Sequence, residues 1–243
     1  MLEQKVFVEN KDFAVRKISI ILPTFNERNN TPILINKISS IMKIPYEIIV
    51  VDDNSSDGTW QVVSDISRKN RNVRLLRRIG KNGIGSAIAD GIKYAKGNAI
   101  VWMDVNLVHP PETIPKLVAK LQSFEIAKAS RYIEGGGDER KFKRKFAARS
   151  LNVISNFLLG GIRDYTAGFL AARKYVFNKV SIDPKSRHGE YCVKFLYEAR
   201  KRGISVTEVP FVMRQRGKSE SKSKFSDYYS YLKLILKLGF NLT

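Results

Sequence analysis

The stretch IIVVDDNSSDGT, residues 48–59, is an apolar run that ends abruptly in acidic and polar residues. Two other stretches share this design: ISIILPTFNE at 18–27 and AIVWMDVN at 99–106. Continuous apolar runs of this length are typical of strands buried on both faces of a parallel sheet. Because parallel strands place their carboxyl ends at one edge, the acids that follow these runs are predicted to share one crevice, suited to a nucleotide and a cation.

Helical segments separate these runs in the first half of the chain. Asn30 or Thr31 is placed to cap the first helix, with Pro32 at its first position. Alternating strands and helices imply right-handed crossovers and an α/β fold whose mostly parallel sheet is flanked by helices. The predicted strands are 18–23, 47–51, 73–77 and 98–103, and the predicted helices are 30–42, 59–69, 86–95 and 111–123.

The second half of the chain is less regular. A basic loop at 214–224 precedes an amphipathic C-terminal helix at 225–239. We expect residues 1–224 to form one domain, and residues 225–243 to pack on it, lie on a membrane or lead into spans beyond this sequence. The other predicted elements here are strands at 125–133, 164–172 and 205–213 and a helix at 147–160.

The composition narrows the class of protein. The chain has 243 residues and a formal net charge of +20. This charge favours binding to polyanionic partners; the alternative is that it reflects a Lys-rich proteome. A nucleic-acid-binding module is disfavoured, because acids at strand ends would repel a phosphate backbone. One cysteine, Cys192, excludes an internal disulfide and fits an intracellular location. We expect no signal peptide, and no run reaches the roughly 18 apolar residues of a membrane span.

The acids at the strand ends have more than one interpretation. Glu27 can accept hydrogen bonds from ribose hydroxyls, or it simply begins a helix. Asp52 and Asp53 would repel each other if both were buried, so they need a donor such as a base or a cation. Alternatively, Asp53 and Asp57 cap the next turn.

A glycine-rich segment, GIGSA at 83–87, allows backbone to approach a ligand at a helix start. Its spacing is neither that of the dinucleotide-binding fingerprint nor that of a Walker motif. The two histidines and Cys192 have no zinc-ligand spacing and no partner that marks a nucleophile.

Taken in order, these motifs resemble those of the polyprenyl-phosphate (dolichyl-phosphate) mannosyl- and glucosyltransferases. This is a membrane-associated branch of the family-2 nucleotide-sugar transferases, which have the GT-A fold. The resemblance spans about residues 17–222. The matching pieces are PTFNE 23–27, VDDNSSDGT 51–59, GIGSA 83–87, DVNLVHPPE 104–112, SRY 130–132, RSLN 149–152, DYTAGF 164–169 and EVP 208–210.

The resemblance implies a role for each matched residue. The nucleotide would be bound by the strand-end and glycine-rich residues, with Mg²⁺ or Mn²⁺ at the diphosphate. The acceptor phosphate would meet arginines, and two further arginines would close over the donor. These residues are Pro23, Phe25, Glu27, Asp52, Asp53, Gly83, Gly85 and Asp104 for the nucleotide; Asp104 and Asn106 for the metal; Arg131, Arg149 and Asn152 for the acceptor; and Arg214 and Arg216 for the closing loop.

The chain departs from that family in two places. The family usually has Asp-x-Asp-x-Gln where this chain has Asp104-Val105-Asn106-Leu107-Val108, so two of three expected metal ligands are altered. The lost charge should weaken the binding of a hard cation. The basic loop 214–224 could neutralise the diphosphate in its place. At 188–194 the family typically has an aromatic-rich stretch ending in Glu, and this chain has HGEYCVK.

The expected activity is inverting transfer of a hexose, with mannose favoured, from GDP-mannose to a polyprenyl or dolichyl phosphate. A phosphate monoester is largely dianionic near neutral pH and needs no general base. The alternatives are a UDP-glucose donor, a hydroxyl acceptor with Asp164 or Glu190 as base, and a degenerate, non-catalytic homologue.

Two segments favour contact with an anionic membrane at its cytoplasmic face. In RKFKRKFAAR, 140–149, Phe142 and Phe146 share one helix face among cations, which is typical of an interfacial helix. A solvated basic face with two core-facing rings is the alternative. Residues 226–240 have a similar pattern, with Lys233 and Lys237 four apart. A peripheral location is expected, or an integral one if C-terminal spans follow.

Overall fold

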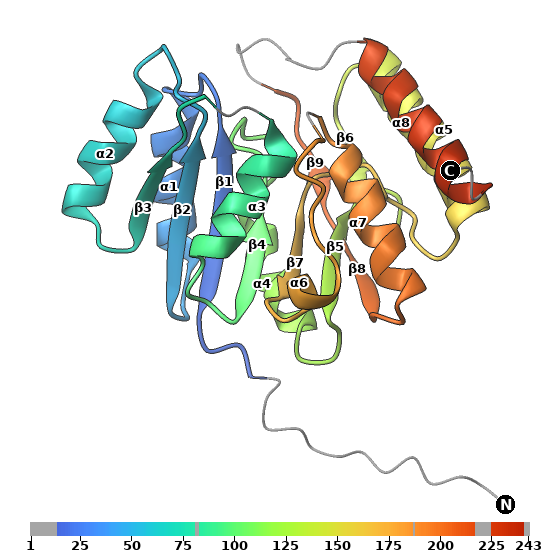
Figure 1. Cartoon of the computed structure of the whole chain (residues 1–243), viewed down its shortest axis with the longest axis horizontal. Coiled ribbons are helices and arrows are strands. Elements are labelled where there is room, and N and C mark those ends of the chain that lie inside the picture. The colour runs from blue at the N-terminus through green and yellow to red at the C-terminus, as the bar shows by residue number, and fades with distance from the viewer. Residues whose placement is uncertain (1–13, 81–82, 187, 217–224, 241–243) are drawn as a thin grey trace, which may run out of the picture.

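The computed structural model describes residues 14–80, 83–186, 188–216 and 225–240, without the side chains of 225–227. These residues form a seven-stranded sheet in the order β3-β2-β1-β4-β7-β5-β8 and a two-stranded sheet, β6-β9 (Figure 1). The strands are β1 Ile18–Thr24, β2 Tyr46–Asp52, β3 Val73–Arg77, β4 Ala99–Trp102, β5 Ile126–Ser130, β6 Gly137–Asp138, β7 Leu170–Arg173, β8 Val206–Pro210 and β9 Val212–Met213.

Helices follow most of the strands. They are α1 Asn30–Ile41, α2 Thr59–Lys69, α3 Ile84–Tyr94, the 3-10 turn η2 Pro111–Thr113, α4 Ile114–Lys120, α5 Phe142–Leu159, α6 Val176–Lys179, α7 Glu190–Lys201 and α8 Phe225–Gly239. All pairings in the large sheet are parallel except those of β7, which runs antiparallel to β4 and β5. The predicted α/β class with a mostly parallel, helix-flanked sheet is confirmed.

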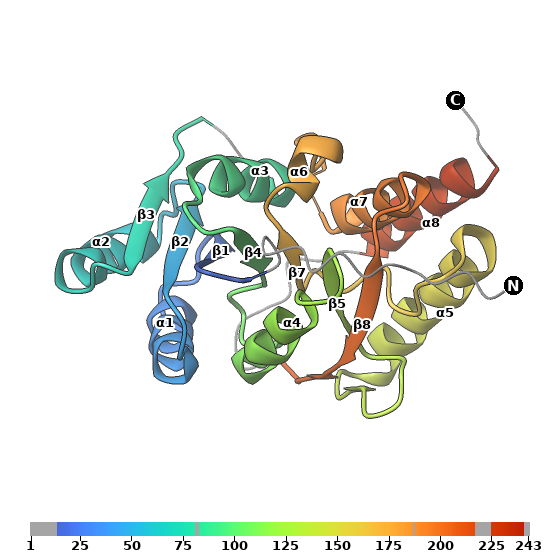
Figure 2. The same cartoon turned by 90° about the horizontal axis from the view of Figure 1, so that it is seen from below.

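Alternation along the buried strands builds a core on each face of the sheet. Ile18, Ile20 and Leu22 of β1 point to one face and pack with α1 and α4. Ile21 of the same strand points to the other, where α3, α6 and α7 cover it, as Figure 2 shows from below. Because helices cover both faces of the sheet, a ligand can reach it only at the ends of the strands.

Several predicted boundaries in the second half were wrong. Residues 164–169 form a turn and not a strand, because backbone amides of that segment donate hydrogen bonds to the Asp164 carboxylate. Helix α5 begins at Phe142 rather than at 147, and the predicted helix 111–123 divides into η2 and α4.

The start of the first helix also differs from expectation. Helix α1 begins at Asn30, so Pro32 is its third residue, and the N-cap residue Asn29 makes no side-chain cap. Asn30 and Thr31 instead donate side-chain hydrogen bonds to Glu27, at 2.6 Å to its carboxylate and 2.7 Å to its carbonyl. The turn after β1 is therefore fastened to Glu27.

Helix α8 has the predicted bounds and packs against α5 and α7 (Figure 1). No helix in the described residues is long and apolar enough to cross a bilayer. The predicted boundary at 224 lies outside the described residues and stays a prediction.

Candidate active site

A cavity of about 730 Å³ lies at the carboxyl ends of β1, β2 and β4. One side, here called the amino-terminal wall, consists of cavity-lining residues between 23 and 109. The opposite side, the carboxy-terminal wall, consists of cavity-lining residues between 131 and 231. Charged side chains of both signs face this space: Glu27, Asp53 and Asp104 on the first wall, and Arg131, Arg140 and Arg216 on the second.

Asp53 is held by a buried arginine that the sequence motifs did not indicate. The Arg78 guanidinium donates to Asp53 Oδ1 through Nε at 2.7 Å, and Gly83 N donates to Asp53 Oδ2 at 3.0 Å. Arg78 also donates to the Gly83 carbonyl at 3.2 Å, so it joins the end of β2 to the start of α3. Burial raises the pKa of Asp53 above its usual range, against the opposing charge of Arg78. The donor that adjacent acids require is therefore supplied by the protein.

Asp52 and Gly85, both predicted to bind nucleotide, lie away from the cavity. Asp52 is fully buried and accepts hydrogen bonds from Ser55 N at 2.8 Å and Ser55 Oγ at 2.6 Å, so it shapes the turn after β2. Gly85 N donates to Ser186 O, and a Cβ at Gly85 would stand 2.3 Å from the Asp183 carbonyl. Gly85 thus serves close packing of α3 and not approach to a phosphate.

The remaining predicted nucleotide residues do line the cavity. Phe25 is 48% exposed at its edge, beside Pro23 and Glu27. Asp57 Oδ1 accepts from Thr59 N at 3.0 Å and so fastens the turn before α2, whose N-cap residue is Gly58.

The turn from Asp104 to His109 is held by its own polar groups. The Asp104 amide donates to His109 Nδ1 at 3.2 Å, and the buried His109 ring stacks on Phe169. Leu107 has φ of 62°, a strained conformation for such a residue. Burial raises the pKa of Asp104 to about 6, opposed first by the charge of Arg216.

These residues fit a divalent cation poorly. Asn106 Oδ1 already accepts from Val108 N at 3.2 Å, and the Asn106 side chain also hydrogen-bonds Asp104. Val108 is buried and has no donor atom. No group of three or more His, Cys, Asp or Glu suited to a metal ion occurs in the described part of the chain.

Arg131 lines the cavity but is fully engaged by other side chains. Its Nε donates to Asp164 Oδ2 at 2.7 Å, and its Nη2 donates to Thr166 Oγ1 at 2.7 Å. Its Nη1 faces Asp138 at 3.4 Å and the Met213 sulfur at 3.6 Å. The neighbouring Arg131 charge holds the pKa of the buried Asp164 well below its usual range.

The other predicted acceptor residues are placed differently. Arg149 is exposed on α5 and does not line the cavity, and Asn152 is buried. The Asn152 amide donates to Ala148 O and Thr166 Oγ1, both at 2.8 Å, so it supports the backbone. The second cavity arginine in this wall is Arg140, which pairs with Asp138 at 2.6 Å and was missed within the basic stretch 140–149.

The two arginines after β9 have different positions. Arg214 faces Glu112 at 3.7 Å and is absent from the cavity lining, whereas Arg216 reaches Glu27 at 2.7 Å. Arg216 therefore joins the two walls. The rest of the predicted basic loop, 217–224, lies outside the described residues.

Neither acid proposed as a base for a hydroxyl acceptor lines this cavity in the described structure. Asp164 is fully buried and ion-paired, so it is a poor proton acceptor. Glu190 Oε2 is buried and has no hydrogen-bond partner in the described residues.

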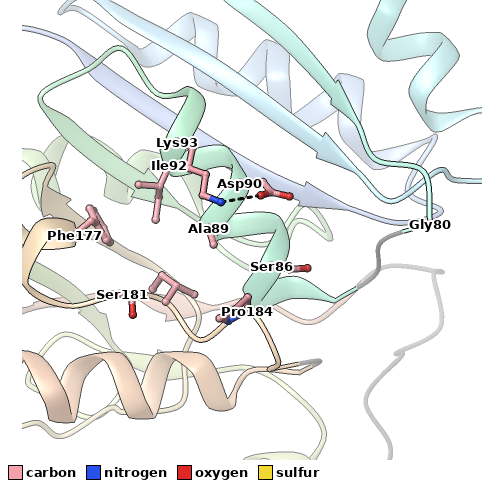
Figure 3. Close-up of a pocket in the computed structure, with 10 residues that line it drawn as sticks. Gly80, Ser86, Ala89, Asp90, Ile92, Lys93, Phe177, Ser181 and Pro184 are labelled. Carbon is pink, nitrogen blue, oxygen red and sulfur yellow. Dashed lines mark ion pairs between the residues drawn. The ribbon is translucent and has the colours of Figure 1, made fainter.

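A second hollow of about 770 Å³ lies between α3 and residues 177–184 (Figure 3). Its polar groups include the Asp90–Lys93 pair, separated by 3.7 Å, and the hydroxyls of Ser86 and Ser181. Because the acids and arginines converge only in the first of these two cavities, that cavity is the candidate active site.

Comparison with known proteins identifies the family of the chain. A family model described as "Glycosyl transferase family 2" matches residues 19–181. Over 230 residues the chain is 38% identical to a dolichol-phosphate mannosyltransferase of Pyrococcus furiosus, covering 91% of this chain and 63% of that protein. Over 217 residues it is 32% identical to a polyprenol monophosphomannose synthase of Mycolicibacterium smegmatis, covering 86% and 81%. The chain thus spans less than two thirds of the first relative.

Solved structures share the fold. Glucosyl-3-phosphoglycerate synthase from Mycobacterium tuberculosis, in complex with Mn²⁺, UDP-glucose and phosphoglyceric acid, has a TM-score of 0.71 at 18% identity. The match covers 93% of this chain and 80% of that one. The same synthase is also known with Mg²⁺ and UDP. At this identity the likeness concerns the GT-A architecture alone.

Proposed function

The chain belongs to glycosyl transferase family 2, and from that premise we propose that it transfers a hexose from a nucleotide sugar to a polyprenyl phosphate. Mannose and GDP-mannose are favoured, because two relatives bear mannose transferase names. The observation that carries the proposal is the cavity at the strand ends, with three carboxylates on one wall and three arginines on the other.

The amino-terminal wall suits the nucleoside. The carboxylates of Glu27 and Asp53 can accept hydrogen bonds from ribose and base, and the exposed ring of Phe25 can stack beside them. Asp53 is preorganised by Arg78 and Gly83, so ordering it costs little on binding. We assign Asp104, which lines the same cavity at the end of β4, to the part of the donor that follows the nucleoside, the diphosphate and sugar.

The carboxy-terminal wall suits an anionic acceptor. An oxygen of the acceptor phosphate attacks the sugar C1, and the C1–O bond to the nucleoside diphosphate breaks with its electron pair leaving on the diphosphate. Such an acceptor needs no general base. Asp164 is paired with Arg131 and is unsuited to accept a proton, which agrees with a reaction that needs no general base. In-line attack of this kind inverts the configuration at C1.

The acceptor's phosphate would be met by arginines. Arg140 lines the cavity and is the arginine assigned to contact the phosphate; Arg131 also lines it, but its N–H groups are already engaged, so it contributes its charge. Arg149 lies outside the cavity on the exposed face of α5, so we assign it to phosphate groups at the membrane surface. Asn152 is assigned to support of the turn at Thr166.

The membrane surface is the proposed partner of α5 and α8. On α5, Phe142, Phe146, Val153 and Phe157 are exposed at spacings of four, seven and four, so they share one face with Arg149. Phe157 is 86% exposed, and the Phe142 and Phe146 rings stack with centroids 6.1 Å apart.

Helix α8, packed beside α5, exposes Tyr229, Leu236 and Phe240 with Lys233. Exposed aromatic rings flanked by cations are typical of helices that lie in an anionic interface. The alternative of core-facing rings is excluded for Phe142 and Phe146 by their exposure. We assign the protein to the cytoplasmic face of a membrane, where a nucleotide sugar and a lipid phosphate meet.

The test is transfer of labelled mannose from GDP-mannose to dolichyl phosphate in detergent, with UDP-glucose run in parallel. Mannosyl lipid as product would support the proposal, and glucosyl lipid would move the donor to UDP-glucose. Product on a soluble hydroxyl acceptor alone would refute the lipid acceptor. No product with any donor, from protein that binds no nucleotide, would indicate a non-catalytic homologue.

A further inference from the structure

In the family's usual metal position, this chain has one carboxylate and two residues that are poor ligands. The oxygen of Asn106 accepts from Val108 N, and its side chain hydrogen-bonds Asp104. The Asn106 oxygen is therefore partly engaged within the turn, and Val108 is buried without a donor atom. A hard cation prefers charged oxygen ligands, and this turn lacks most of the ligands that would bind one.

A positively charged side chain, that of Arg216, lies on the opposite wall of the same cavity. Arg216, which follows β9, donates through Nη2 to Glu27 Oε1 at 2.7 Å, a contact between residues 189 apart in sequence. Its side chain is only 15% exposed. Arg216 and Asp104 both line this cavity, so the guanidinium shares with Asp104 the space assigned to the diphosphate.

From this we propose that Arg216, and not a divalent metal ion, neutralises the donor's diphosphate in this chain. The inference rests on the proposed function, because it presupposes a nucleotide-sugar donor. An arginine fork binds two phosphate oxygens at once and keeps its charge at any physiological pH. It can therefore stabilise the charge that appears on the departing diphosphate without gaining or losing a proton.

Arg216 differs from the other cavity arginines in the partner it has. Arg131 and Arg140 pair with Asp164 and Asp138, two carboxylates that do not line the cavity in the described structure. The Glu27 carboxylate does line it, and it is the group assigned to ribose hydroxyls. Donor binding can thus exchange partners: ribose takes Glu27, and the diphosphate takes Arg216.

The experiment is equilibrium binding of GDP and GDP-mannose to the whole chain by calorimetry, with EDTA or with added Mg²⁺ or Mn²⁺. The proposal expects affinities within about twofold in all three buffers. Arg216→Gln should weaken binding by roughly 10- to 100-fold, as loss of a charge-assisted contact does. The matched control is Arg202→Gln, which removes the same charge from a surface pair with Glu198 at 4.0 Å and should leave binding unchanged.

A converse variant tests the altered turn. Asn106→Asp with Val108→Gln rebuilds the family's donor set, and it should bind Mn²⁺ measurably by electron paramagnetic resonance. Combined with Arg216→Gln, it should regain GDP binding only when Mn²⁺ is present. Asn106→Asp alone avoids the buried Val108 and serves if the double change unfolds the protein.

The outcomes separate the inference from the proposed function. If EDTA abolishes GDP binding by the unaltered chain and Mg²⁺ restores it, the metal acts and the inference fails while the proposed function stands. If Arg216→Gln binds GDP as tightly as the unaltered chain, the inference also fails. If neither GDP nor UDP binds in any buffer, the proposed function itself is refuted.

Discussion

The two walls of the cavity are built by different physical means. In the amino-terminal wall, polar side chains follow strand ends and are oriented largely by nearby backbone groups and turns, as Asp104 is by the turn to His109. In the carboxy-terminal wall, Arg131 and Arg140 are fixed by side-chain carboxylates, Asp164 and Asp138. Asp104, in the first wall, faces the cavity without an ion pair to another described residue, whereas Asp164 and Asp138, which lie behind the second wall, are structural counterions.

This difference predicts opposite consequences for removing Asp164 and for removing Asp104. Loss of a counterion leaves a buried arginine unpaired and destabilises the fold. Loss of Asp104 removes a desolvated charge that has no ion-pair partner among the described residues. Active sites commonly carry such unfavourable groups at a cost in stability.

The largest expected effect is that of Asp164→Asn. The change leaves Arg131 buried, with its side chain 2% exposed and its main partner gone. Breaking one side of a buried pair costs about 3–5 kcal/mol, and we expect that loss in the free energy of unfolding in urea. The control is Asp65→Asn, which breaks the exposed pair with Arg68 and should cost no more than about 0.5 kcal/mol. Equal losses in the two variants would contradict a structural role for Asp164.

The second effect is smaller and has the opposite sign. Asp104 has a pKa raised by burial to about 6, against 3.8 ordinarily. An acid whose pKa is raised by folding disfavours the fold once it is ionised, so its cost is absent below about pH 4 and complete above about pH 6. Asp104→Asn should therefore stabilise the ligand-free protein at pH 7.5 by about 1–2 kcal/mol, allowing for solvent in the cavity.

Thermal unfolding at two pH values checks this sign. The gain in melting temperature for Asp104→Asn should be present at pH 7.5 and largely gone at pH 4. A variant that is less stable than the parent at pH 7.5 would show that Asp104 belongs with the structural counterions.

The same contrast explains what the sequence could predict. Strands β1 and β2 and helix α2 lie within a residue or two of their predicted bounds, because apolar runs and turn residues are local signals. The acids that end these strands were found in the same way. Asp52 was grouped with Asp53 as a nucleotide residue, because adjacency in sequence does not say which of two acids lines the cavity; of the two, Asp53 does. Strand alternation sends Asp52 inward to Ser55 and leaves Asp53 for Arg78.

In the carboxy-terminal wall the deciding contacts join distant residues. Arg131 and Asp164 are 33 apart, and Arg216 and Glu27 are 189 apart. Nothing in local periodicity reports such pairs, so Arg149 was assigned to the acceptor phosphate by resemblance alone, and Arg140, which lines the cavity, was not predicted. The turn at 164–169 was predicted as a strand for the same reason, since its conformation depends on Arg131.

The third prediction concerns the outer side of the carboxy-terminal wall. Phe142→Ser with Phe146→Ser removes two exposed rings from α5 and should lower the affinity for vesicles containing anionic lipid by about tenfold, since each ring buries apolar area in the interface. Ile33→Ser with Tyr94→Ser, at exposed positions on α1 and α3, is the matched control and should bind as the parent does. Flotation or tryptophan fluorescence titration measures both. Parallel losses would place the membrane contact elsewhere.

The smallest expected effect concerns the amino-terminal wall. It tests whether the side chains of this wall keep their orientation without buried ion pairs. Arg78 is its exception, a buried guanidinium that orients Asp53 and contacts the Gly83 carbonyl. Arg78→Lys keeps the charge but loses the fork, so GDP affinity should fall by about threefold to tenfold, with a smaller loss of unfolding free energy than Asp164→Asn causes. Arg74→Lys, which alters a pair with Glu47 beneath the opposite end of the sheet, should leave affinity intact. If Arg78→Lys instead unfolds the protein as severely as Asp164→Asn, both walls depend on buried ion pairs and the distinction between them fails.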